Sequence, residues 1–83
     1  MSSIQEEELI TLTKLRTMAG LSQRQMSIAL EVNYNTISAW ETGKHEPRLT
    51  SSQWFRLRDT LKCSFEELDR AIQNQKRLAI KSN

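Results

Sequence analysis

The spacing of helix-capping residues between positions 22 and 43 constrains the fold of this chain more than any other feature. Ser22 and Asn33 favour the N-cap of a helix, and Gly43 readily takes the left-handed conformation that ends one. Only two residues therefore separate a short helix over 23–30 from a second short helix over 34–42. Two short helices joined by so brief a break must cross steeply, so the second lies across the first with one side turned outward.

The rest of the chain also shows helical spacing of apolar residues, and no stretch alternates apolar and polar residues as a strand would. A first helix is expected over 5–19, and two more are expected after Leu49. Capping boxes begin four of the expected helices: Ser3 with Glu6, Ser22 with Gln25, Thr50 with Gln53, and Ser64 with Glu67. The expected inward residues include Leu9, Leu12, Leu15, Ala19, Met26, Ala29, Leu30, Ile37, Trp40, Trp54, Leu57, Leu61, Phe65, Leu68 and Ile72. The sequence therefore predicts an all-α fold of five short helices.

A chain of 83 residues has room for one domain, and 37 % hydrophobic residues suffice for a small core. We expect residues 1–83 to form a single domain whose globular part covers 5–72. Residues 73–83 are polar apart from Leu78, Ala79 and Ile80. This end either continues the last helix and meets a partner subunit, or frays.

Several classes of protein find no support in the sequence. Cys63 is the only cysteine, which excludes an intramolecular disulfide or a cysteine-cluster metal site and indicates a reducing compartment. No apolar run is long enough for a membrane span or a signal peptide. His45 and Cys63 have no acidic residue held near either in a catalytic arrangement. We therefore expect no catalytic residue, no metal, no cofactor and no enzymatic activity.

The outward side of the expected helix over 34–42 is the strongest candidate for a binding surface. If Ile37 faces inward, the residues on or near the exposed arc are Tyr34, Asn35, Ser38 and Ala39. None of them is acidic, and a helix about 10–12 Å across with such a surface fits the roughly 12 Å major groove of DNA. The charge distribution agrees, because residues 14–58 carry seven basic and three acidic side chains.

A larger set of residues recurs between positions 9 and 72 at a characteristic spacing. The set comprises Leu12, Leu15, Arg16, Gly20, Leu21, Ser22, Gln23, Met26, Leu30, Val32, Ile37, Ser38, Trp40, Glu41, Gly43, Lys44, Pro47, Leu57, Leu61, Ser64, Glu66, Glu67 and Leu68. With these residues the chain resembles the phage-repressor and Cro (Xre-type) helix-turn-helix family. The resemblance implies a compact lambda-repressor-like DNA-binding domain of five helices, in which the second and third form the helix-turn-helix and 34–42 is the recognition helix.

The resemblance also implies a role for individual polar residues. Base-reading positions fall on Tyr34, Asn35, Ser38 and Ala39, and the Asn35 amide can bond adenine N6 and N7 together. Positions that contact DNA phosphates or position the helix fall on Gln23, Arg24, Thr36, Lys44 and Arg48. Arg16 and Glu41 match a structural ion pair that sets the angle of the recognition helix.

Three residues depart from the family pattern, all away from the recognition surface. Ser27 replaces the usual alanine, and its hydroxyl can bond back along its helix. Glu31 stands where glycine is common, so a left-handed conformation there would add roughly 1 kcal/mol of strain. Arg58 stands where alanine is common and must reach solvent or a partner.

We interpret Trp40 and Trp54 as core residues.

Together these features predict sequence-specific binding of double-stranded DNA and regulation of transcription, with repression as the expected mode. One recognition helix contacts too few base pairs for selectivity, so we expect a homodimer on an inverted-repeat operator with half-sites roughly 34 Å apart. No membrane and no small-molecule ligand domain is expected, and the location is cytoplasmic, at the nucleoid of a prokaryote or a phage-infected cell. The alternative is a protein-interaction adaptor or antitoxin module with the same fold, which the net charge of +2 keeps open.

Overall fold

The computed structural model describes residues 9–82, and the side chains of residues 9–77. Within this range five helices follow one another: α2 (Leu12–Met18), α3 (Gln23–Leu30), α4 (Tyr34–Thr42), α5 (Ser51–Leu61) and α6 (Phe65–Ser82). The described residues contain no strand. The predicted all-α fold is confirmed.

Polar side chains at the N-caps explain where each helix begins. Each accepts a hydrogen bond from a backbone amide in the first turn: Thr11 from Lys14, Ser22 from Gln25, Asn33 from Asn35, Thr50 from Gln53, and Ser64 from Glu67. Reciprocal bonds complete a capping box at Ser22, Thr50 and Ser64. These bonds satisfy amide groups that have no partner inside their helix.

Helices α2 to α5 end in a shared backbone geometry. In each, an amide beyond the helix donates to the carbonyl five residues earlier: Leu21 to Arg16, Val32 to Ser27, Lys44 to Ala39, and Cys63 to Arg58. The preceding residue in each case has a positive φ: Gly20 at 77°, Glu31 at 57°, Gly43 at 79° and Lys62 at 55°. Two of these four positions carry a side chain, and the left-handed conformation costs each of them about 1 kcal/mol relative to an ordinary helical one.

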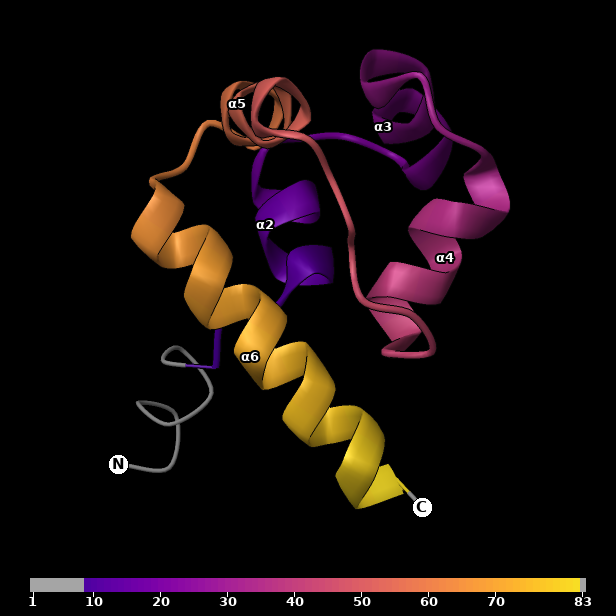
Figure 1. Cartoon of the computed structure of the whole chain (residues 1–83), viewed down its shortest axis with the longest axis vertical. Helices are drawn as coiled ribbons and strands as arrows, with labels where there is room; N and C mark the ends of the chain where they lie inside the picture. Colours follow the sequence, from indigo (N-terminus) through magenta and orange to yellow (C-terminus); the bar gives the residue numbers. More distant parts are fainter. Residues whose placement is uncertain (1–8, 83) are drawn as a thin grey trace.

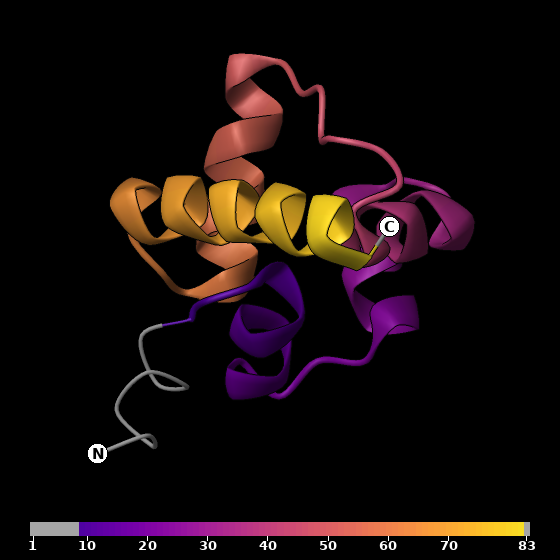
Figure 2. The same ribbon diagram turned by 90° about the horizontal axis from the view of Figure 1, so that it is seen from below.

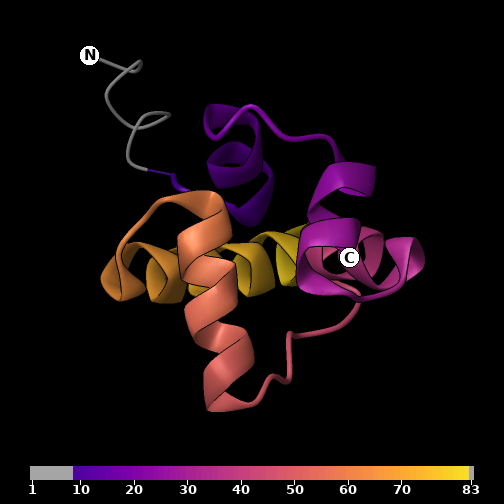
Figure 3. The same ribbon diagram turned by 90° about the horizontal axis from the view of Figure 1, so that it is seen from above.

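The helices enclose one hydrophobic core. Figure 1 shows α2 in the middle of the molecule, with α3 and α4 together on one side and α6 along the other. Figure 2 shows α6 crossing in front of α5, with α2 beside it, and Figure 3 shows α5 on the opposite face, in front of α6. The buried core residues are Leu12, Leu15, Met26, Leu30, Ile37, Trp40, Leu57, Leu61, Leu68, Ala71 and Ile72. Trp54 is partly buried and packs against this core, as expected for a structural residue.

Within the described residues, the helix expected over 5–19 begins at Leu12 and ends at Met18. Residues 9–11 are not helical, and α2 starts at Leu12 because the side chain of Thr11 accepts from the Lys14 amide at 3.2 Å. Leu9 is correspondingly exposed instead of inward. The expected Ser3–Glu6 capping box lies outside the described residues.

Besides Leu9, two more residues that were expected to face inward are exposed. Ala29 is exposed, since the buried side of α3 is formed by Met26, Ser27 and Leu30. The buried Ser27 hydroxyl donates to the Arg24 carbonyl at 2.7 Å. This is the bond back along the helix that was expected for a serine at a position where the family usually has alanine.

Phe65 is the second, since 42 % of its surface is exposed. Its ring meets the Phe55 ring edge-on with centroids 5.2 Å apart, so the two aromatic residues pair outside the core. The Arg58 guanidinium lies over both rings, at 5.4 Å and 4.9 Å from their centroids, and it also bonds Asp59. Arg58 thereby finds the partners that its unusual position requires.

Helix α6 runs past residue 72, the expected end of the globular part. Asn74 and Gln75 are both buried, and the helix continues to Ser82. For residues 73–82 the last helix therefore continues, and the contact with a partner subunit that was expected with this continuation stays a prediction. The packed part of the chain extends at least to Gln75.

Candidate nucleic-acid interface

Helix α4 turns an uncharged polar surface outward. Its buried residues are Ile37, Trp40 and Glu41, whereas Tyr34 and Asn35 are exposed. Ser38 and Ala39 are half-buried at the edges of this surface. The Asn35 amide side chain makes no hydrogen bond to any of the described residues, so its donor and acceptor are both available to a ligand.

The single charged residue of α4 is directed inward. Glu41 is 8 % exposed, and its carboxylate meets Arg16 of α2 with Nε 2.6 Å from Oε2. A second guanidinium nitrogen of Arg16 donates to Oε1 at 3.2 Å, and a third donates to the Leu21 carbonyl at 2.8 Å. The ion pair expected from the resemblance is thus present, in a two-pronged form that fixes orientation as well as distance.

Two further side chains donate to the same carboxylate. Thr13 Oγ1 donates to Glu41 Oε1 at 3.0 Å, and Gln23 Nε2 donates to it at 2.9 Å. Glu41 therefore connects α4 to α2 and to the first residue of α3. Gln23 braces the recognition helix through this bond, which leaves its other N–H available for the expected phosphate contact.

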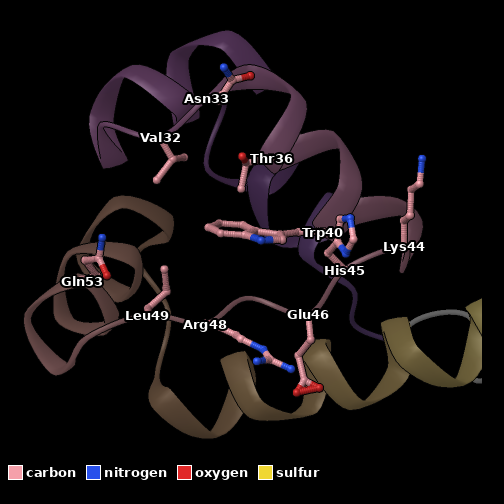
Figure 4. Close-up of a pocket in the computed structure, with 10 residues that line it drawn as sticks. All are labelled: Val32, Asn33, Thr36, Trp40, Lys44, His45, Glu46, Arg48, Leu49 and Gln53. Atoms are coloured by element: carbon pink, nitrogen blue, oxygen red, sulfur yellow. The ribbon is translucent and has the colours of Figure 1, made fainter.

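Hollows flank the outward surface of α4 on two sides. One lies at the N-terminus of α3 and is lined by Arg16, Ser22, Gln23, Arg24 and Tyr34. Another runs between α4, the following loop and α5, with a volume of about 730 Å³. Figure 4 shows the Trp40 indole across this second groove, with Lys44 and His45 at one end and Gln53 and Val32 at the other.

The structure divides the expected phosphate contacts between these two hollows. Gln23 and Arg24 line the hollow beside Tyr34, and Thr36, Lys44 and Arg48 line the groove of Figure 4. Arg24, Lys44 and Arg48 are exposed, and Thr36 is half-buried. Basic and hydroxyl groups lie on both sides of the uncharged outward surface of α4. This arrangement matches a major groove bordered by two phosphate backbones.

Sequence reasoning missed Thr13 and Gln75 as supports of the recognition helix. Thr13 could have been found, because it lies three residues before Arg16 and so on the same side of α2. Gln75 donates to the backbone carbonyl of Glu41 from 34 residues away. No local sequence pattern predicts a contact between residues so far apart in the chain.

Cys63 has the environment of a structural thiol. Burial raises the pKa of the Cys63 thiol, the neighbouring Glu67 carboxylate raises it further, and Arg58 partly opposes both. The thiol is therefore protonated at neutral pH and is a poor nucleophile. Within the described part of the chain no cluster of His, Cys, Asp and Glu side chains could hold a metal ion, and no helix there is long and apolar enough to span a membrane.

Comparison with known proteins agrees with this geometry. Residues 12–68 match the helix-turn-helix family, a range that runs from the start of α2 into α6 and includes α3 and α4. No curated protein and no solved structure gives a match. The family consists of DNA-binding transcription regulators and is generally non-enzymatic. The chain belongs to the Xre/Cro-type helix-turn-helix family of DNA-binding regulators.

Proposed function

We propose that this protein is a sequence-specific transcription repressor that inserts α4 into the major groove of its operator. One observation carries the proposal: the single charged side chain of α4, Glu41, is turned inward and neutralised, so the outward side presents Tyr34 and Asn35 without an acidic group. A carboxylate on that side would be repelled by the phosphate backbones. The proposed location, the cytoplasm at the nucleoid, follows from this ligand.

In the proposed complex Asn35 reads bases by a bidentate bond to adenine, while Tyr34, Ser38 and Ala39 supply shorter contacts. Gln23, Arg24, Thr36, Lys44 and Arg48 bond phosphates and so fix the register of the helix. Arg16 and Glu41 hold the angle without touching DNA. This division separates residues that determine sequence preference from residues that determine overall affinity.

We further propose that the protein acts as a homodimer. One helix of nine residues reaches a few base pairs, which are too few to mark one site in a genome. Two copies related by a two-fold axis would read an inverted repeat with half-sites roughly 34 Å apart. The outer side of α6 and the loop over 43–50 are the proposed contact between the copies.

Selection of bound duplexes from a random pool tests the proposal directly. Enrichment of an inverted repeat whose half-sites lie about one helical turn apart is the expected result. A pool that stays random after several rounds would contradict sequence-specific binding. Enrichment of a single half-site would support α4 readout and contradict the dimer.

The competing function is that of a protein-interaction adaptor or antitoxin module. Two observations favour it. The net charge of +2 is low for a DNA-binding protein. Phe55 and Phe65 form an adjacent pair of exposed aromatic side chains, which is the kind of surface that can bind another protein. A salt titration separates the two functions. Contact with about four to eight phosphates gives a steep fall of log affinity with log salt, near −0.9 per contact, whereas an adaptor gives no such slope on DNA.

A further inference from the structure

Two consecutive residues of α6 hold the end of the recognition helix and the loop that follows it. Gln75 Nε2 donates to the backbone carbonyl of Glu41, in the last turn of α4. Lys76 Nζ lies 2.9 Å from Glu46 Oε1, in the loop beyond α4. The Lys76–Glu46 pair is about half exposed, whereas the Gln75 bond is buried. Gln75 is therefore the stronger of the two links.

The carbonyl of Glu41 needs a partner from outside its helix. In a longer helix the amide of His45 would bond it, but α4 ends at Thr42 and that amide donates to the Ala39 carbonyl instead. Gln75 supplies the missing donor from α6. The bond thus depends on where the helix ends, and it would break if the end of α4 moved relative to α6.

Gln75 is a costly residue for this purpose, because its other polar atom is buried without a partner among the described residues. Its side-chain oxygen Oε1 accepts no hydrogen bond from any of them, although the residue is only 9 % exposed. A buried oxygen in this state destabilises the fold. A methionine of similar length would remove that oxygen but would leave the Glu41 carbonyl without its donor, so the two effects on stability oppose each other. A net gain in stability therefore does not account for a glutamine here.

The two ends of Glu41 are fixed from different directions. Its carboxylate is held by Arg16 and Gln23, from α2 and α3, and its backbone carbonyl is held by Gln75, from α6. A side-chain anchor alone lets the end of α4 pivot about the flexible side chain. The second anchor, on the backbone, removes that freedom. Asn35 and Ala39 lie on the same rigid helix, so their placement depends on both anchors.

We propose that Gln75 is a positioning residue for sequence readout, which fixes the orientation of α4 through the backbone of Glu41. Its contribution is to discrimination between the operator and other DNA, and not to the stability of the fold. The inference rests on the proposed function, because it assigns base reading to α4. It adds a residue of α6, outside the helix-turn-helix, to the determinants of specificity.

The test compares Gln75→Met with Gln73→Met in the full chain. Gln73 is exposed two positions earlier on the same helix, so the control makes an identical chemical change without touching the link. Three quantities are measured: the melting temperature, the ratio of affinities for the selected operator and a scrambled duplex at fixed salt, and hydrogen exchange of the Lys44 and His45 amides, which bond Ala39.

For Gln75→Met we expect a melting temperature close to that of the wild type, because loss of the buried, unpartnered Oε1 offsets loss of the donor to the Glu41 carbonyl. We also expect faster exchange of both amides and an affinity ratio reduced about tenfold, equivalent to about 1.4 kcal/mol. Gln73→Met should match the wild type in melting temperature and in exchange of both amides; a change of its affinity ratio through the proposed dimer contact would leave that exchange unaltered. An unchanged ratio and unchanged exchange would overturn the inference. So would a parallel loss of stability and of affinity for both duplexes, since that is the behaviour of a structural residue.

The exchange measurement keeps failure of the inference distinct from failure of the proposed function. If the wild type prefers no DNA sequence, the proposed function fails and the specificity role falls with it. Faster exchange at Lys44 and His45 in Gln75→Met alone would still support the positioning of α4 by α6. Equal hydrogen exchange of these amides in Gln75→Met and Gln73→Met would also overturn the positioning of α4 by α6.

Discussion

The two sides of α4 use polar groups in opposite ways. On the inner side the Glu41 carboxylate accepts hydrogen bonds from three residues, and its backbone carbonyl accepts one from a fourth residue, Gln75. On the outer side the Asn35 amide bonds none of the described residues and is exposed to solvent. The inner polar groups have their hydrogen-bond partners within the fold, whereas the outer ones bond water until a ligand replaces it.

This contrast shows how the helix separates the residues that determine stability from those that determine recognition. A buried polar group that loses its partner destabilises the whole protein, whereas an exposed one exchanges its partner for water at little cost. Substitutions of the charged pair on the inner side should therefore change folding first and DNA binding as a consequence. Substitutions on the outer side should change binding and leave folding alone.

The largest expected effect comes from breaking the inner ion pair with Arg16→Met. The Arg16 and Glu41 side chains are 12 % and 4 % exposed, so this substitution leaves a buried carboxylate without its counter-charge. We expect the free energy of unfolding to fall by about 3 kcal/mol. Urea denaturation followed by circular dichroism measures this change.

A double variant provides the control for that prediction. In Arg16→Met with Glu41→Leu no unpaired charge remains, and apolar side chains fill similar volumes, so most of the lost stability should return. A loss below about 1 kcal/mol in the single variant would mean that the pair behaves as a surface salt bridge. The inner and outer sides of α4 would then not differ in the way described.

The outer side is tested by Asn35→Ala. The affinity for the selected operator should fall by about 1–3 kcal/mol, because the bidentate bond to a base is lost, while the melting temperature stays unchanged. Binding is measured by fluorescence anisotropy on the operator and on duplexes altered at each base pair. Preference should relax at one base pair; an equal loss on every duplex would contradict base reading by Asn35.

A smaller effect is expected of Lys44→Ala, at the rim of the groove in Figure 4. Lys44 is exposed and is proposed to bond a phosphate, so its loss should weaken binding to every duplex alike. The slope of log affinity against log salt should become shallower by about one per subunit. Lys62→Ala, the same substitution at an exposed residue at the end of α5, serves as the control, and a shift in base preference would contradict the phosphate role.

How much of this could be predicted depended on the distance over which each signal acts. The caps at Ser22, Asn33 and Thr50 are local, because each side chain bonds an amide two or three residues away, and the helices that they begin are confirmed. Thr11 offered the same kind of cap within the expected helix over 5–19. Apolar residues at Leu9, Leu12 and Leu15 keep helical spacing on both sides of Thr11, so the periodicity did not indicate a helix start there.

Longer-range features were accessible only in part. Arg16 and Glu41 are 25 residues apart, and their pairing was expected from the family resemblance and not from the local pattern. Gln75 lies beyond the range of that resemblance, and its bond to Glu41 depends on how α6 crosses α4. Phe65 was expected inside from helical spacing, but spacing could not reveal that Phe55 and Arg58 offered it an external partner.

The smallest effect concerns the turn that sets α3 against α4, tested by Glu31→Gly. Glu31 has a φ of 57°, a conformation that glycine adopts without steric cost, so we expect stabilisation by about 0.5 kcal/mol once the greater freedom of glycine in the unfolded chain is counted. The ion pair lost with Glu31 spans 3.6 Å to Arg56 between exposed side chains and contributes little. Thermal denaturation of both proteins measures the change.

Lys62→Gly is the matched control, because Lys62 has nearly the same φ of 55° but lies at the end of α5. Both variants should be stabilised to a similar degree if the left-handed conformation is the cause. Operator affinity should then separate them: the turn at 31 lies directly before the recognition helix, so added flexibility there opposes binding, whereas flexibility at 62 does not. Destabilisation of Glu31→Gly alone would show instead that the Glu31 side chain itself holds the turn, and that the outer side of α4 depends on a surface contact as much as on the buried network behind it.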